Sequence, residues 1–188
     1  MLGAILFPLL CAGAILIGHS QPERSDFFSY FGDCGGIPCY LGVVPGQTNW
    51  DSALTTFESK PELAYSPQTN TAFNPPGFQG SALLYSLPEQ NLVEEIDLTM
   101  RSTNVSFGSL LQRFGDPCGV QVSGNSGLSI VFLRMIVAVY ADKLGADQVL
   151  QPTTPVYSMS LFNRFQSCEQ IMSSIAAAPW KGFVRYTS

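Results

Sequence analysis

The sequence predicts an α+β fold, in which an antiparallel sheet is packed by two or three short helices. Strand-like segments follow one another in runs between helical segments, without the strict alternation that builds a parallel sheet. Residues 92–100 alternate between apolar and polar side chains, as in a strand with one face in water. Two helical segments, 49–59 and 106–114, each end at a proline and precede strands, which also suggests two related helix–strand units.

The length and composition fit one domain with an ordinary core. The chain has 188 residues, of which 46% are hydrophobic, 12% aromatic and 12% charged. A chain of this length buries about 70% of its unfolded surface, and this apolar content excludes intrinsic disorder. The net charge is −5, so the chain lacks the basic surface that nucleic-acid binding needs, and no nucleic-acid partner is expected.

The first twenty residues are interpreted as a signal peptide. Residues 4–18 form an uncharged apolar run, about 22 Å long as a helix and so shorter than the roughly 30 Å membrane core. This length suits a secretory signal, and Gly18 and Ser20 place small residues before the expected cleavage after Ser20. The alternatives are a buried N-terminal helix and an uncleaved anchor, and only the anchor would attach the chain to a membrane.

Export gives the cysteines a structural meaning, because thiols pair in oxidising compartments. Removal of residues 1–20 would leave four cysteines, which allow three connectivities. The segment from Cys34 to Cys39 contains two glycines and a proline, which help so short a ring to close. We therefore favour Cys34–Cys39 with Cys118–Cys168, over crossed pairings or free thiols. Zinc is not expected, since neither a second close cysteine pair nor a mature histidine completes four ligands.

The mature chain is expected to begin with an arm, a strand and a helix. Residues 21–39 form an irregular arm whose aromatic residues dock partly on the core. A single α+β domain then spans 40–188 and opens with a short strand at 40–44. The helix at 49–59 starts after Thr48, and Asp51 three residues later resembles a capping box.

A long loop and a series of strands follow this helix. The loop at 61–79 contains four prolines among polar residues. Strands are expected at 80–86 and 92–100, before the helix at 106–114, and another strand at 118–122 after it.

The most apolar run of the mature chain is 128–141. Arg134 near its middle predicts two strands folded at a tight turn, or else one bent strand. A membrane helix is the rival interpretation, but the run is short for a membrane and rich in β-branched residues. A strand at 155–161, a helix at 167–177 and an aromatic tail at 179–183, packed as a plug, complete the expected order.

Two segments resemble a known family of envelope proteins. The stretch Gly42–Thr48, followed by a helix and Pro61, resembles the "G-x-T, helix, G-x-P" pattern of small outer-membrane lipoproteins of the SmpA/OmlA type. Residues 110–122 are similar to the same pattern, and the β-lactamase inhibitor protein fold repeats similar helix-plus-sheet units. Residues 39–48 and the tail Trp180–Phe183 also resemble a group of uncharacterised exported bacterial proteins.

The resemblance implies a helix-plus-sheet fold, a place in the cell envelope, and a role in binding or envelope structure. It carries no catalytic residue to this chain. The chain departs from the lipoproteins in its greater length. It also has the bulky Leu10 where a small residue should precede the lipidated cysteine, so lipidation of Cys11 is disfavoured.

Several catalytic mechanisms lack their residues. The single histidine, His19, lies in the predicted signal peptide, so the mature chain has no Ser-His-Asp or Cys-His set and no histidine for a metal. No glycine-rich phosphate loop is present, and no cofactor is expected. Glu94 and Glu95 are adjacent and face opposite sides of a strand, whereas Asp97 shares a face with Glu95. Such a pair fits a glycan hydrolase or, more simply, a solvated strand face.

The aromatic residues in or beside the long loop are the expected partner-binding patch, namely Trp50, Tyr65, Phe73 and Phe78. Packing in the core is the alternative for them. We interpret the chain as an exported protein, periplasmic, cell-surface or extracellular, with a non-enzymatic binding or envelope-structure role and an envelope protein or glycan as partner. A carboxylate-only extracellular hydrolase and a secreted protein inhibitor with an uncovered apolar sheet face are the alternatives.

Overall fold

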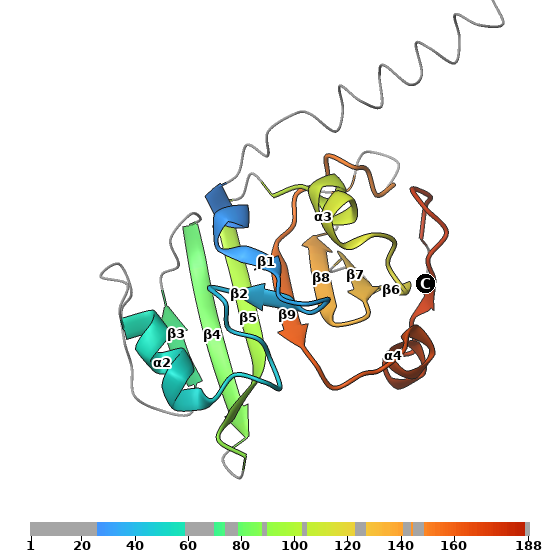
Figure 1. Cartoon of the computed structure of the whole chain (residues 1–188). Helices are drawn as coiled ribbons and strands as arrows, with labels where there is room; N and C mark the ends of the chain where they lie inside the picture. The colour runs from blue at the N-terminus through green and yellow to red at the C-terminus, as the bar shows by residue number, and fades with distance from the viewer. Residues whose placement is uncertain are drawn as a thin grey trace, which may run out of the picture.

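In the residues that it describes, a computed structural model shows an eight-stranded antiparallel sheet, a small β-hairpin and three α-helices (Figure 1). The structure describes residues 26–58, 70–73, 79–87, 90–102, 105–122, 127–140, 144 and 149–186. The predicted α+β class is confirmed. The predicted signal peptide, residues 1–20, lies outside the described residues. Within the described residues, no helix has the length and apolar character needed to cross a membrane.

The elements follow one another in an order that mixes helices and strands. Their bounds are η1 (Asp26–Ser29), β1 (Phe31–Asp33), β2 (Pro38–Tyr40), α2 (Trp50–Glu58), β3 (Asn70–Phe73), β4 (Gln79–Leu87), β5 (Leu92–Ser102), α3 (Phe107–Phe114), β6 (Gly119–Val122), β7 (Gly127–Phe132), β8 (Met135–Tyr140), β9 (Ser158–Phe162), α4 (Cys168–Ile175) and β10 (Ala178–Pro179).

The strands of the large sheet lie in the order β10-β6-β7-β8-β9-β5-β4-β3. Two meanders, β3-β4-β5 and β6-β7-β8, run toward the centre from opposite edges, and β9 lies between them. Helix α2 precedes the first meander and α3 the second, and both pack on the same face. All neighbouring strands are antiparallel, so β5 and β8 point the same way. The two units therefore share an element order but have opposite hands, and no rotation superposes them.

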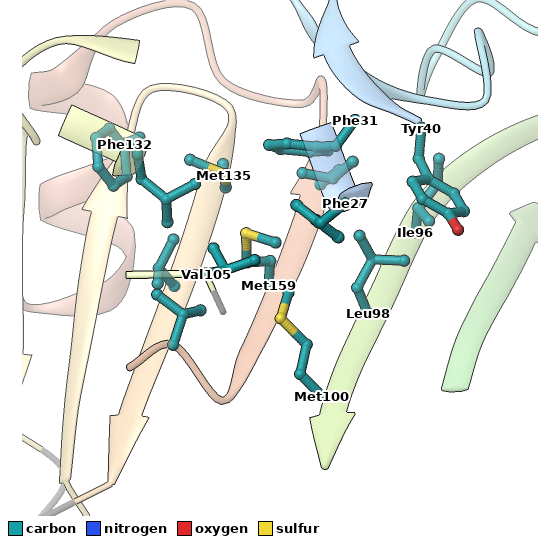
Figure 2. Packing of buried hydrophobic residues seen from close by; sticks show 14 of the residues in the cluster. Phe27, Phe31, Tyr40, Ile96, Leu98, Met100, Val105, Phe132, Met135 and Met159 are labelled. Atoms are coloured by element: carbon teal, nitrogen blue, oxygen red, sulfur yellow. The ribbon is translucent and has the colours of Figure 1, made fainter. Parts of the chain in front are cut away.

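One face of the sheet carries the main core, because alternate residues of each strand point to it. Leu98, Met159, Val137, Ile130 and Val120 form one continuous row across five strands, each paired with the next. All five are buried. The N-terminal arm covers the middle of this face, and Figure 2 shows rings of the arm close to side chains of the central strands.

The helices α2 and α3 cover the same face on either side of the arm (Figure 1). Helix α2 buries Ala53 and Phe57, which are four residues apart and so share one helical face. Helix α3 buries Phe107 and Leu110, and the side chain of Ser106 caps its first turn by accepting a hydrogen bond from the backbone of Ser109 (3.3 Å).

Helix α4 packs on the opposite face of the sheet. Its Ile171 is fully buried with Val131 of β7 and Phe162 of β9, which point away from the main core. The disulfide Cys118–Cys168 joins the start of β6 to the first residue of this helix. Helix α4 is therefore tied to the sheet both by apolar packing and by a covalent bond.

Both predicted disulfides are present. Cys34–Cys39 closes the turn between β1 and β2, and Cys118–Cys168 spans 50 residues. Structural disulfides persist in oxidising compartments, so they indicate a non-cytoplasmic protein.

Most predicted elements are confirmed, and the predicted hairpin at 128–141 turns at Leu133 and Arg134. The strand predicted at 40–44 is wrong. β2 ends at Tyr40, because Leu41 and Gly42 both take positive φ angles and turn the chain.

Other boundaries of the prediction also differ from the structure. The arm predicted as irregular contains η1 and β1, and the predicted loop 61–79 contains β3. Thr48 does not cap α2: its hydroxyl accepts from the backbone of Val44 (2.8 Å), and Asn49 instead accepts from the backbone of Asp51 (3.0 Å).

Candidate functional site

The face of the sheet opposite the main core is polar over the central strands. One row of paired residues crosses it as Ser81, Thr99, Ser158, Ala138 and Ser129, and all five remain partly exposed. No described helix other than α4 packs on this face, and the α4 contacts lie around Val131 and Phe162. We call this region the polar face. It differs from the uncovered apolar face that a protein inhibitor was expected to show.

Two carboxyl groups lie side by side on the polar face. Glu95 and Asp97 are two residues apart on β5, so they point the same way, as the sequence predicted. Burial raises the pKa of Glu95 above its ordinary value of 4.5, and the charge of Asp97 raises it further, whereas Arg164 opposes this effect. Oδ1 of Asp97 is buried without a hydrogen-bond partner. The pair therefore holds more negative charge than its surroundings neutralise.

Tyr85 of the neighbouring strand β4 completes the acidic part of the polar face. It lies directly opposite Glu95 in the register of β4 and β5. Burial raises the pKa of the Tyr85 hydroxyl, and the charge of Asp97 and a hydrogen-bonding interaction with it raise the pKa further. Tyr85 therefore keeps its proton at neutral pH and can act as a hydrogen-bond donor.

Arg164 is the cation of this region. Its Nη2 lies 2.9 Å from Oε2 of Glu95, and its guanidinium lies 5.3 Å from the ring centre of Phe162 and 5.8 Å from that of Phe165. The ion pair and the two rings fix the plane of the guanidinium. Arg164 was not singled out in the sequence, because it is 69 residues from its partner Glu95.

This arrangement does not match the usual geometry of a glycan hydrolase. Glycosidases keep their acid and their second carboxylate about 5 Å or more apart, so that the sugar fits between them. Here Glu95 and Asp97 lie two residues apart on one face of a single strand, and interaction with Asp97 contributes to the raised pKa of Glu95. The pair is better suited to binding a ligand than to acting from two sides of one.

Two tyrosine rings stand at the far end of the polar face. Tyr140 of β8 and Tyr157 before β9 have ring centres 3.8 Å apart, and Tyr140 is 39% exposed. A small cavity beside them is lined by Gly127, Ser129 and Ala138 of the β7–β8 hairpin, among others. The two rings are tilted by 34° to each other, and they offer an apolar surface with polar edges at this end of the face.

A small cavity lies where β9 leaves β5. Beyond Phe162, the loop before α2 takes the place of β9: Gly46 donates to the carbonyl of Val93 (2.7 Å), and Val93 donates to the carbonyl of Thr48 (3.0 Å). We call the cavity at this point the junction pocket. Its volume is about 180 Å³, and it is lined by Gly46, Gln90, Leu92, Val93, Glu94, Asn163 and Arg164.

A larger and more open groove of about 780 Å³ runs beside the β1–β2 hairpin. It is lined by residues of the arm, the hairpin, α2 and α3, among them Phe28, Tyr30 and Arg113. The guanidinium of Arg113 sits 5.2 Å from the ring centre of Phe28. Its charged lining residues are Asp33 and Arg113.

The aromatic residues predicted to bind a partner do not form one described patch. Trp50 is the first residue of α2 and packs partly buried against the main core. Phe73 is the last residue of β3, opposite Ala82. Tyr65 and Phe78 lie outside the described residues. The candidate binding surface is therefore the polar face and not the long loop. The sequence indicated this face only through Glu95 and Asp97.

No metal site emerges from the described part of the chain, where no three His, Cys, Asp or Glu side chains come together. The two cysteine pairs are occupied by disulfides.

Comparisons with known proteins give one structural neighbour. No family model matches the sequence. No curated protein is significantly similar to it. The crystal structure of a DUF4309 family protein (YjgB) from Bacillus subtilis subsp. subtilis str. 168 is similar at a TM-score of 0.40 and 12% identity, over 66% of this chain and 84% of that chain.

Proposed function

We propose that this chain is an exported, non-enzymatic binding protein, periplasmic, cell-surface or extracellular, which binds a glycan or an envelope protein through the polar face. The observation that carries the proposal is a row of small side chains, mostly hydroxyls, flanked by an acidic pair and by two neighbouring tyrosines, on a face that α4 covers only in part. The two disulfides support a location outside the cytoplasm.

A glycan is the partner that this surface favours. Sugars present hydroxyl groups, which pair with Ser, Thr and carboxylate side chains, and apolar ring faces, which stack on aromatic rings. Thr99, Ser158 and Asp97 offer the first kind of contact, and Tyr140 with Tyr157 offers the second.

The test is co-sedimentation of the secreted chain with insoluble cell-wall peptidoglycan and with chitin. We expect saturable binding that falls about tenfold in affinity in Tyr140→Ala and in Asp97→Asn. Phe183→Ala is the matched control, because Phe183 is similarly exposed at 42% but packs against Phe107 on the core side. Binding to neither glycan, with specific capture of one envelope protein that the same variants abolish, would assign the face to a protein partner.

A carboxylate-only hydrolase is the second candidate, favoured by one observation. The raised pKa of Glu95 is the property that a general acid needs. The same incubations are assayed for released reducing ends. Release that disappears in Glu95→Gln would establish hydrolysis, whereas binding without release supports the binding protein.

A further inference from the structure

The junction pocket combines features that the sheet alone does not require. β5 has a bulge where Tyr85 pairs with Glu95 but Ser86 pairs with Val93, so Glu94 is the extra residue. Bulges redirect a side chain and occur often beside binding sites. Here the bulge places an acidic residue in the wall of a cavity that Arg164 also lines.

Asn163 supplies an unsatisfied group in the same wall. Its side-chain Oδ1 is buried and has no hydrogen-bond partner. A Cβ at Gly46 would lie 3.2 Å from Cβ of Asn163 and 3.3 Å from its Nδ2, so a larger residue would require Asn163 to shift by a few tenths of an ångström. The wall is thus closely packed, and Oδ1 of Asn163 lies beneath its surface, out of reach of solvent.

Arg164 is held in position before any ligand arrives. Its ion pair with Glu95 uses one nitrogen, and the rings of Phe162 and Phe165 flank its guanidinium. A guanidinium has five N–H donors and prefers to bind carboxylates through two of them. Its side chain is half exposed, so the N–H groups that Glu95 does not use are open to an anion.

We propose that the junction pocket binds a small free α-amino acid. The ligand carboxylate would pair with Arg164, and the ligand ammonium would donate to Glu94. Leu92 supplies an apolar contact for a short side chain. The volume of about 180 Å³ is below the range of about 300–1,000 Å³ typical of sites for larger ligands, which limits the ligand to the smallest amino acids. The pocket adjoins the polar face, with which it shares Arg164, and the proposal is the same whichever partner the polar face binds.

The test is isothermal titration calorimetry of the secreted, disulfide-bonded chain with glycine, L-alanine and L-serine. We expect one saturable site for at least one of them. Alaninamide lacks the carboxylate and propionate lacks the ammonium, so each should bind at least about tenfold more weakly than L-alanine. L-Phenylalanine should not bind, because its ring exceeds the cavity.

Two variants assign the charges, each with a matched control. Arg164→Gln and Glu94→Gln should each weaken binding about tenfold or more. Arg113→Gln removes another arginine that packs over a phenylalanine ring, and Glu169→Gln removes an exposed acid on α4; both should bind as the wild type does. Circular dichroism and thermal melting establish that each variant is folded.

Three results would overturn the assignment: no saturable binding of the three small amino acids, binding of alaninamide and propionate as tight as that of L-alanine, or undiminished binding in both folded variants. None of them bears on the proposed function, since glycan binding is measured separately and depends on Tyr140 and Asp97. Loss of glycan binding with retained amino-acid binding would refute only the proposed function.

Discussion

At the scale of single residues, the polar face and the junction pocket depend on side chains whose surroundings change their chemistry. Glu95 is the clearest example, because the strand that buries it also places Asp97 beside it. Arg164 offsets this only in part, since it is half exposed and its ion pair is screened by solvent. The result is an acidic site whose charge depends on pH.

Glu95 should make stability depend on pH in a defined direction. Its pKa is raised in the folded state above the ordinary value of 4.5. Its contribution to the free energy of unfolding is therefore complete below pH 4.5 and is lost as the pH rises through the folded-state pKa. The difference in free energy of unfolding, wild type minus Glu95→Gln, should fall as the pH rises. Urea unfolding at steps from about pH 4 to pH 7.5 measures it.

Asp97→Asn provides the control for this titration. It removes the neighbouring charge that helps to raise the pKa of Glu95, so the pH-dependent fall caused by Glu95 should become smaller. Comparison of Asp97→Asn with the double variant Glu95→Gln/Asp97→Asn isolates the contribution of Glu95 when the neighbouring charge is absent. If the difference in free energy of unfolding between the wild type and Glu95→Gln stays level or increases with pH, the raised pKa of Glu95 is contradicted.

Gly46 should tolerate substitution less well than Gly42. Both have positive φ angles, 73° and 78°, so alanine is strained at either position. At Gly42 an added Cβ meets nothing within 4 Å, whereas at Gly46 it meets Asn163 at 3.2 Å. Gly42→Ala should cost about 1 kcal/mol, and Gly46→Ala should cost more because the contact adds to the backbone strain. Equal denaturation midpoints for Gly42→Ala and Gly46→Ala would mean that Asn163 moves away freely.

At the scale of secondary-structure elements, most of the fold could be predicted from the sequence. The alternation along 92–100 and the helical spacing around Leu110 are local signals, and they predicted β5 and α3 correctly. β3 was missed because it lies in a proline-rich, polar stretch, and its main signal is its pairing with β4. Tertiary context of this kind is absent from any local window.

The candidate site was less predictable than the fold. Glu95 and Asp97 could be found, because alternation on a strand fixes which side chains share a face. Arg164 and Asn163 could not, because they reach β5 only through the pairing of β5 with β9, which the sequence does not specify. The cap of α2 was also predicted incorrectly, because Thr48 and Asn49 are adjacent and either side chain is an acceptable cap.

Loss of the cap of α3 should weaken the fold measurably. Ser106 accepts from the backbone of Ser109 at 3.3 Å, and α3 buries two large side chains against the core. Ser106→Ala should lower the free energy of unfolding by about 1 kcal/mol, while Ser106→Thr should retain most of it because the hydroxyl remains. Chemical denaturation of both variants measures the difference, and equal losses would argue against a capping role.

At the scale of the whole molecule, two covalent bonds of different reach stabilise the fold. Cys118–Cys168 closes a segment of 50 residues and Cys34–Cys39 one of 5 residues. In the chain-entropy model, the longer loop contributes about 4 kcal/mol and the shorter about 2. The Cys118→Ala/Cys168→Ala pair should therefore lower the melting temperature clearly more than the Cys34→Ala/Cys39→Ala pair does.

Alanine pairs are the appropriate test for the disulfides. Cys39 is buried, so serine there would add the cost of an unsatisfied hydroxyl to the loss of the bond. Alanine at both ends also leaves no free thiol to exchange. A larger loss for the short ring would show that packing around Cys34 and Cys39 outweighs chain entropy.

The mature protein is predicted to begin at Gln21. The reason is the uncharged apolar run at 4–18, followed by small residues at Gly18 and Ser20. N-terminal sequencing of secreted material should read Gln21 or a residue close to it. Recovery of the chain in membranes with Leu2 to Leu10 intact would support an anchor in place of a cleaved signal.

The position of β9 also determines when the sheet can be completed. β5, eleven residues long, must wait for a partner strand that begins more than fifty residues later in the chain. Until β9 is synthesised and inserted, β5 and β8 each present an unpaired edge, and such edges pair readily with other chains. Pairings so distant in sequence also form slowly. If the chain is exported as proposed, β9 is among the last segments to cross the membrane, and a chaperone that holds unfolded chains in the receiving compartment would suit this topology.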